Sequence, residues 1–398
     1  MQKKTLANGM EVIWQPKPSD AVVIQAFVKV GSNYETKNML GAAHFVEHML
    51  FETKKRPAKQ LAFEIESLGG VINAFTEKEF TTVYVYIAKK YFEKGLDVIA
   101  DVIKNTSFNE EMFKIEKSII LNEIKFWYDD PKDRKWDLYF QALFPKHPTG
   151  NPTIGTKKTV KAITRNMLYD FYKKYYSPKN MSIAVLGNVK NVFKKVEDAF
   201  SDFHRKFHKK EIKKALAINK HVVKREKRNI EHAHIVLGYA IPTRESKESY
   251  VFDIMANILG YGLSSWLADE IRQKRGLAYH VAAETQYGKQ YGTFAVELST
   301  NKEHVKECLK IILEQFNRLQ KLTKKQLNDA KKSVMGLHAI KKDNSIQHAT
   351  LLNYWNYIKD ARFAEKYPKF IKAVRLEDVK KLAKEFLNEN YSLAVIAP

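Results

Sequence analysis

Two histidines and a glutamate near the start of the chain have the residue types and spacing needed to bind and use a metal ion. His44 and His48 are four positions apart in the segment GAAHFVEHMLF, and Glu47 directly precedes the second histidine. Four positions are about one turn of an α-helix, so both imidazoles would project from one face toward a single ion. Imidazoles suit zinc, and a neighbouring carboxylate could take a proton from a water at the metal. The pattern H-x-x-E-H therefore predicts a hydrolytic metal centre on a helix.

The residues around this motif favour a helix with two unlike faces. The segment contains no proline, and its one glycine, Gly41, stands at its start. At about 100° per residue, the two histidines and Glu47 fall within one arc of the helix. The opposite arc is apolar and holds Ala42, Phe45, Val46 and Met49. The alternative is a pair of core histidines with ordinary hydrogen-bond partners beside a surface glutamate.

A second segment offers the further carboxylate that a zinc site requires. Catalytic zinc sites usually have three protein ligands and one open position. Residues 108–127, FNEEMFKIEKSIILNEIKFW, contain neither proline nor glycine and have apolar residues at helical spacing. Glu116 and Glu123 are seven apart and share a face on which Ile119 and Ile120 lie between them. Unpaired carboxylates in an apolar stripe are costly, and a metal or a ligand histidine would offset that cost. The alternative is two solvated helix glutamates.

Together these segments resemble the pitrilysin or insulinase family of zinc peptidases. The resemblance is closest to the short, two-domain type that includes mitochondrial processing peptidase and its bacterial relatives. That family carries H-x-x-E-H followed, roughly seventy to eighty residues later, by a glutamate ligand, with another glutamate seven before it. Here Glu123 lies 75 residues after His48, and Glu116 lies seven before Glu123. The resemblance implies one zinc ion on His44, His48 and Glu123, with Glu47 as the base and Glu116 as an acid that orients the site.

A strand-like segment matches the same family and suggests where substrate docks. LGGVINAFTEKEFTTVYVYI at 68–87 resembles the family's glycine–asparagine–alanine strand, and the resemblance extends from TLANGMEVIW to the final NYSLAVIAP. It implies that an extended peptide adds as an extra strand beside Asn73, Ala74 and Phe75. We therefore expect zinc-dependent cleavage of unfolded peptides of modest length inside a closed chamber. A non-catalytic scaffold or assembly subunit of the same family is the alternative.

Composition narrows the partners and the location. The 398 residues are 44% hydrophobic, and 68 Lys and Arg against 45 Asp and Glu give a net charge of +23. No basic block with interleaved aromatic residues dominates, so we expect a lysine-rich surface rather than a nucleic-acid partner. No run of about 18 apolar residues is present, so no membrane partner is expected. Cys308 is the single cysteine, which excludes an intrachain disulfide, and a start without a signal-like apolar core predicts a cytoplasmic protein.

Internal similarity predicts two copies of one design. NMSIAVLGNV at 180–189 matches the C-terminal NYSLAVIAP, and LAFEIESLGGVIN at 61–73 aligns with LADEIRQKRGLAY at 267–279 at an offset of 206, which pairs Gly70 with Gly276. We therefore expect a zinc-binding catalytic domain over 1–205, a charged linker over 206–228 and a homologous domain over 229–398. Alternating strands and long helices predict an α+β fold in which each domain has a mainly antiparallel sheet with helices packed on one face.

The second copy lacks the metal motif but carries another pair of residues. At the offset of 206, the positions that match the three motif residues hold Tyr250, Asp253 and Ile254. Arg272 and Tyr279 lie seven apart in EIRQKRGLAYHV. The family has such a pair in its last domain, which implies that the arginine holds substrate and the tyrosine contacts the scissile carbonyl. Without the resemblance they read as a helix-end arginine and a strand tyrosine.

The resemblance also implies a partner chain. Four such domains enclose the family's chamber, so a two-domain chain is expected to form a homodimer in which Arg272 and Tyr279 act across the interface, with a heterodimer still open. The segment NILGYGLSSWLADE at 257–270 has only Gly260 and Gly262, unlike the long glycine-rich loop of the non-catalytic mitochondrial subunit. The basic charge also fits poorly with recognition of basic presequences. We therefore expect a peptidase that does not process mitochondrial presequences.

Overall fold

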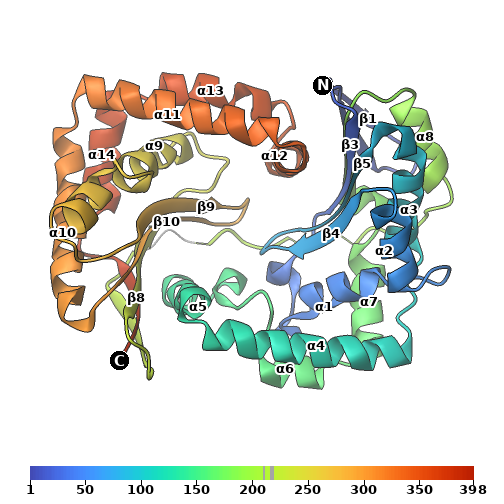
Figure 1. The fold of residues 1–398 in the computed structure, drawn as a ribbon, viewed down its shortest axis with the longest axis horizontal. Coiled ribbons are helices and arrows are strands. Elements are labelled where there is room, and N and C mark those ends of the chain that lie inside the picture. The colour runs from blue at the N-terminus through green and yellow to red at the C-terminus, as the bar shows by residue number, and fades with distance from the viewer. Residues whose placement is uncertain (209–210, 216–218) are drawn as a thin grey trace. The chain divides into compact units, whose positions relative to one another are not determined.

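The computed structural model describes residues 1–208, 211–215 and 219–398, which form two compact units (Figure 1). The first unit comprises Met1–Lys125, Asn151–Ile212 and Lys341–Ala364, and the second comprises Phe126–Gly150, Lys213–Ile340 and Glu365–Pro398. Each unit thus includes one segment from the opposite half of the chain. The domain limits expected from the sequence stay a prediction, and the expected linker at 206–228 includes 209–210 and 216–218, which lie outside the described residues.

The first unit is built on a six-stranded sheet in the order β1-β2-β6-β3-β5-β4. All neighbouring strands are antiparallel except β2 and β6. The strand β4 lies at one edge of this sheet, next to β5. The strands are β1 (Gln2–Thr5), β2 (Glu11–Gln15), β3 (Ala21–Val28), β4 (Val71–Thr76), β5 (Thr81–Ala88) and β6 (Met181–Leu186).

The second unit repeats this topology in a five-stranded sheet, β7-β11-β8-β10-β9. Strand for strand it matches β2-β6-β3-β5-β4, and again only the pair that matches β2 and β6 is parallel. The expected α+β fold with two related, mainly antiparallel sheets is therefore confirmed. The strands are β7 (Val222–Lys227), β8 (Ala233–Ala240), β9 (Val281–Tyr287), β10 (Gly292–Thr300) and β11 (Ser392–Ala397).

A single offset does not relate the two copies along their whole length. The strands β3 and β8 are 212 residues apart, although the pairing proposed from the sequence uses 206. The glycine with a left-handed backbone is Gly276 in the second unit (φ 63°) and Gly69 in the first (φ 74°). The conformational counterpart of Gly276 is therefore Gly69 and not Gly70, because the connecting segments differ in length between the copies.

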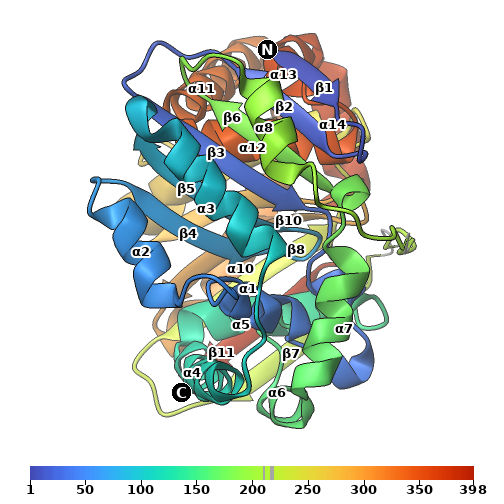
Figure 2. The same ribbon diagram turned by 90° about the vertical axis from the view of Figure 1, so that its right-hand side faces the viewer.

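Helices cover the first sheet on both faces, so the expectation of helices on one face is wrong for this unit. The reason is that a helix from the C-terminal half of the chain, α12 (Ser345–Ile358), covers the face opposite α3 (Phe92–Lys104). The helix α3 lies against β3 and β5 in both views (Figures 1 and 2). Its Gly95 allows this approach, since an added Cβ would lie 3.0 Å from Ile24 and 3.1 Å from Val85. The remaining helices of this unit are α1 (Ala42–Leu50), α2 (Ala58–Glu66), α4 (Glu110–Asp129, which continues into the second unit), α6 (Lys157–Ala162), α7 (Arg165–Tyr175) and α8 (Val192–Phe200).

The helix α12 comes from the C-terminal half of the chain and packs on the opposite face of the first sheet. Its fully buried Asn353 donates from Nδ2 to Gln25 Oε1 (3.0 Å) and accepts from Ser182 Oγ (2.7 Å). Gln25 neighbours Ile24 on β3, and successive strand residues point to opposite faces. The core of the first unit therefore includes a segment that lies far away in the sequence.

The sheet of the second unit is likewise covered by a helix from the opposite half of the chain. The helix α5 (Pro131–Leu143) packs on β8 and β11, and its buried Tyr139 donates to the carbonyl of Phe294 (3.3 Å). The other helices of this unit are α9 (Ser249–Gly260), α10 (Val305–Arg318), α11 (Lys324–Asp343), α13 (Phe363–Ala373) and α14 (Leu376–Phe386).

No helix within the described part of the chain is long and apolar enough to cross a membrane.

Candidate metal centre

The motif helix α1 is anchored by a residue that the sequence did not single out. Glu35, almost fully buried, accepts the backbone N–H groups of Gly41 (2.9 Å) and Ala43 (2.8 Å). It thus satisfies two of the free N–H groups at the start of the helix. Gly41 has a left-handed backbone (φ 93°), and an added Cβ would lie 2.6 Å from the carbonyl oxygen of Ile154. Together these contacts define where α1 begins and which way it faces.

The apolar side of α1 brings the second predicted segment beside it. Phe45 is fully buried and stacks on Phe113 of α4, with ring centroids 5.2 Å apart and planes 4° from parallel. Ile120, also on α4, is fully buried in the same core. Since α4 is continuous over Glu110–Asp129, this packing brings Glu116 and Glu123 toward the polar side of α1.

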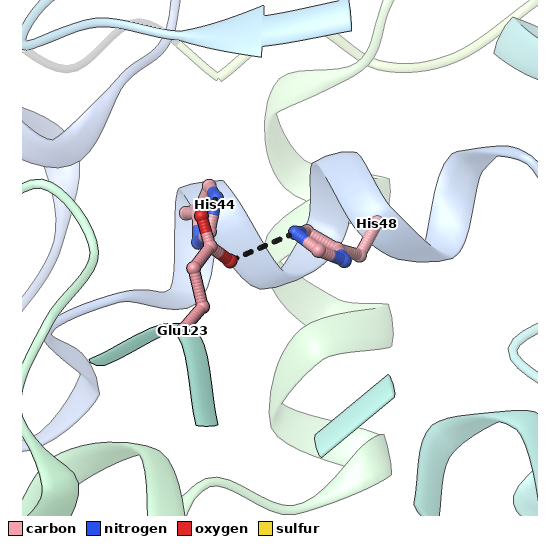
Figure 3. A group of neighbouring side chains, drawn as sticks. All are labelled: His44, His48 and Glu123. Atoms are coloured by element: carbon pink, nitrogen blue, oxygen red, sulfur yellow. Dashed lines mark ion pairs between the residues drawn. The ribbon is translucent and has the colours of Figure 1, made fainter. Parts of the chain in front are cut away.

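Three side chains converge to form one compact cluster (Figure 3). Glu123 lies with Oε1 3.7 Å from His44 Nε2 and Oε2 3.5 Å from His48 Nε2. One donor atom from each of the three residues lies within 4.8 Å of the others, and no other such group occurs in the part of the chain that the structure describes. Residues 75 positions apart in the sequence thus present two imidazole nitrogens and a carboxylate to one point.

Glu116 contacts the cluster from behind. Its Oε2 lies 2.9 Å from Nδ1 of His48, and both side chains are about four-fifths buried. In the neutral form of His48, a proton on Nδ1 donated to Glu116 leaves the lone pair of Nε2 facing Glu123 and His44. A carboxylate that holds a ligand histidine in this way sets its tautomer and ring orientation.

The electrostatics of the two histidines differ. Burial, with help from the neighbouring His48, lowers the pKa of His44 to about 4, so its imidazole is neutral at neutral pH. Burial alone would lower the pKa of His48 as well, but hydrogen bonds to Glu116 and Glu123 outweigh it and raise that pKa to about 9. The hydrogen bond to His48 also lowers the pKa of Glu123, against the effect of burial. Without a bound cation His48 is therefore protonated at neutral pH, and its Nε2 must lose a proton before it can bind a metal ion.

Glu47 lies beside this cluster in a more apolar setting. Its side chain is nearly buried, and its Oε2 accepts a hydrogen bond from Thr76 Oγ1 at 2.5 Å. Burial raises the pKa of Glu47, and the hydrogen bond from Thr76 opposes this only in part. A carboxyl group with raised proton affinity suits a residue that takes up a proton and later returns it.

The donor set fits zinc. Two imidazole nitrogens and one carboxylate oxygen form a three-ligand set that leaves a position open for water or substrate. The buried Oε2 of Glu123 has only the long 3.5 Å contact with His48 Nε2, so a bound cation would offset more of the cost of burying it. His44, His48 and Glu123 could therefore hold the ion that the sequence motif implies.

The remaining predicted site residues lie on two other elements. Asn73, Ala74 and Phe75 lie on the edge strand β4, where the backbone N–H of Ala74 donates to Asn73 Oδ1 (2.7 Å). Arg272 lies in a π-helical turn (Ala268–Gln273) of the second unit.

Arg272 and Tyr279 contact each other within the second unit. The guanidinium of Arg272 sits 4.7 Å from the ring centroid of Tyr279. Tyr279 is 83% exposed, an unusual state for a tyrosine that only supports the fold. The ring of Tyr279 is therefore open to solvent, and the half-buried Arg272 lies against it.

The second unit uses its counterpart of Glu47 for a different purpose. Asp253, on α9, accepts two hydrogen bonds from Arg244 (2.6 and 3.0 Å) and one from the hydroxyl of Tyr367 (2.7 Å). Thr285 on the edge strand β9 adds a further hydrogen bond (3.0 Å). The position thus holds a buried ion pair between Asp253 and Arg244.

Comparison with known proteins agrees with this division. Residues 11–157 match the family model described as Insulinase (Peptidase family M16), and residues 162–334 match the one described as Peptidase M16 inactive domain. An uncharacterized zinc protease of Mycobacterium leprae is 32% identical over the whole chain and 91% of its own length. The uncharacterized zinc protease YmxG of Bacillus subtilis is 30% identical over the whole chain and 98% of its length.

Two solved structures share the fold. A protease from Helicobacter pylori superposes with a TM-score of 0.93 at 22% identity, covering all of this chain and 99% of the other. A structure from Pseudomonas fluorescens, described as a peptidase M16 inactive domain, gives 0.92 at 20% identity, with coverage of 100% and 97%. Fold and sequence together define a two-domain protein of the zinc-protease type. The chain belongs to the insulinase family, peptidase family M16, as its motifs predict.

Proposed function

We propose that this protein is a zinc-dependent endopeptidase that hydrolyses unfolded peptides of modest length inside a closed chamber. The convergence of His44, His48 and Glu123 on one point, with the buried carboxyl group of Glu47 beside it, is the observation that carries the proposal. The names of the relatives, zinc protease in each case, support it.

Each residue of the site has a distinct task in this reaction. His44, His48 and Glu123 would hold one zinc ion, which when bound makes a water more acidic and polarises a carbonyl. Glu47 accepts the proton of the attacking water and then delivers it to the leaving amine. Glu116 keeps the ring of His48 in the orientation that presents Nε2. The raised pKa of Glu47 strengthens it as the acceptor of the water's proton, and the more basic leaving amine then takes that proton from it.

The edge strand β4 is the proposed docking place for the peptide. It pairs with β5 on one side and ends the sheet on the other, so an extended peptide can add as a further strand near Asn73, Ala74 and Phe75. Such pairing reads an extended backbone more than particular side chains. Unfolded peptides are therefore the proposed substrate class.

A second copy of the chain is the proposed partner. Tyr279 is exposed and is in contact with the half-buried Arg272, which supports a role for the pair in meeting substrate. In this proposal they act on the metal centre of the other protomer, the tyrosine at the carbonyl oxygen and the arginine on the peptide.

The test compares wild type with Glu47→Gln on a mixed set of unfolded peptides, after equal zinc content has been measured. Glu66→Gln is the matched control, because Glu66 is an exposed glutamate at the end of α2. We expect the wild type and Glu66→Gln to cut, and Glu47→Gln to lose nearly all turnover. Absence of cleavage by all three, with zinc bound, would favour the non-catalytic scaffold. Equal cleavage by all three would contradict the role of Glu47.

A further inference from the structure

The last residue of the edge strand holds the carboxyl group of Glu47. Thr76 ends β4, and its Oγ1 donates to Glu47 Oε2 at 2.5 Å. Glu47 forms no ion pair with a lysine or arginine among the described residues, so this hydrogen bond is what orients its carboxyl group. A carboxylate on a helix is thereby tied to a strand of the sheet.

Thr76 is itself positioned by the buried part of the sheet. It is the register partner of Thr81 on β5, and the two hydroxyl oxygens lie 3.4 Å apart. Thr81 is fully buried and donates to the carbonyl of Val30 at 2.9 Å. Glu47 is thus connected through Thr76 and Thr81 to the buried interior of the first unit.

The second unit contains the same kind of hydrogen bond, from a threonine on the edge strand to a carboxylate on a helix, but has no metal-binding motif. Thr285 lies on the edge strand β9 and donates to Asp253 on α9 at 3.0 Å, as Thr76 does from β4 to Glu47 on α1. There the carboxylate is neutralised by two hydrogen bonds from Arg244. Within the described part of the first unit, no lysine or arginine pairs with the carboxyl group of Glu47, which remains available for proton transfer. The hydrogen bond from the edge-strand threonine to the helix carboxylate is therefore common to both units, and in the first unit it holds the carboxyl group of Glu47.

We propose that Thr76 is a positioning residue that aims the Glu47 carboxylate, and that it couples this aim to the strand on which the peptide docks. The inference rests on the proposed function. The peptide would hydrogen-bond to the backbone of β4, and Thr76 belongs to the same strand. A displacement of β4 on docking is therefore passed to Glu47 through one hydrogen bond.

The test removes the hydroxyl group and then restores it. Thr76→Val keeps the size of the side chain and deletes the hydrogen bond, whereas Thr76→Ser keeps the hydroxyl. Thr82→Val is the matched control: Thr82 is fully buried on β5, its side chain points to the sheet face opposite Thr81, and its hydroxyl has no hydrogen-bond partner in the described residues.

We expect Thr76→Val to lower kcat by about 10- to 100-fold, the usual loss when a reacting group is misplaced, with zinc content and KM little changed. Thr76→Ser should recover most of kcat, and Thr82→Val should match wild type. Crystal structures of Thr76→Val and wild type provide a readout independent of activity. The variant should show the Glu47 carboxylate turned away while His44 and His48 stay in place.

Several results would overturn the inference. A wild-type kcat in Thr76→Val, an equal loss in Thr82→Val, or no recovery in Thr76→Ser would each do so. Loss of zinc from Thr76→Val would show that the residue supports the metal ligands instead. If wild type cuts no peptide, the proposed function fails first, and an unmoved Glu47 in the crystal structure of Thr76→Val then refutes the positioning role separately.

Discussion

Replacement of Glu116 by glutamine tests the metal centre most directly. The carboxylate lies 2.9 Å from Nδ1 of His48, and the two side chains are 19% and 22% exposed. A hydrogen bond between such ionised or polarised groups contributes about 1.5–3 kcal/mol. At about 1.4 kcal/mol per tenfold change, the loss of that bond corresponds to a zinc affinity weaker by about 10- to 100-fold. The neutral amide keeps the size of the side chain, so packing is preserved.

Zinc affinity is best measured by competition with a chromophoric chelator at neutral pH. Glu111→Gln is the control, because Glu111 is an exposed glutamate on the same helix and its substitution removes the same charge. We expect Glu111→Gln to bind zinc like wild type and to unfold at the same temperature. An affinity in Glu116→Gln within about threefold of wild type would refute the orienting role. An equal loss in both variants would show a general effect of charge on α4.

Two further predictions concern pH and assembly. Burial raises the pKa of Glu11, but Lys29 and Lys3 outweigh it and lower that pKa to about 2. This carboxylate therefore stabilises the fold above its ordinary pKa of 4.5 and loses about 3 kcal/mol of that contribution as the pH falls toward 2. Urea unfolding should show this pH dependence in wild type and a flatter one in Glu11→Gln, and equal slopes would contradict the assignment. If the site is shared between protomers, an equal mixture of the Glu47→Gln and Tyr279→Phe proteins should recover about one quarter of wild-type activity. Half of the dimers in the mixture contain one chain of each kind, and each such dimer has one intact site out of two. A mixture that recovers no activity would contradict a shared site.

Local periodicity made the helices of the site predictable. His44 and His48 repeat at one helical turn, and Glu116 and Glu123 repeat at two, so the sequence alone placed each pair on one face of a helix. The structure has those helices at Ala42–Leu50 and Glu110–Asp129. Nothing in the periodicity states that the two helices meet. That expectation came from the family resemblance, and the structure supplies a physical reason in the stacking of Phe45 on Phe113.

Other contacts of the site had no local signal. Glu35 anchors the start of α1 from six residues before Gly41, across a turn whose shape the residue types do not determine. Thr76 reaches Glu47 from 29 residues away, because the sheet brings the end of β4 beside α1. Both are ordinary polar residues in the sequence, and only their neighbours in space distinguish them.

The sequence by itself predicted the α+β class, the candidate metal-binding residues of the first copy and the absence of their motif from the second copy, because these depend on residue type and on spacing within single elements. Tertiary structure alone decided which segment completes each core. Asn353 of α12 bonds to Gln25 in the first unit, and Tyr139 of α5 bonds to the backbone of Phe294 in the second. Contacts between segments so far apart in the sequence depend on the burial of complementary surfaces in the whole fold, and the periodicity of a single helix or strand does not predict them.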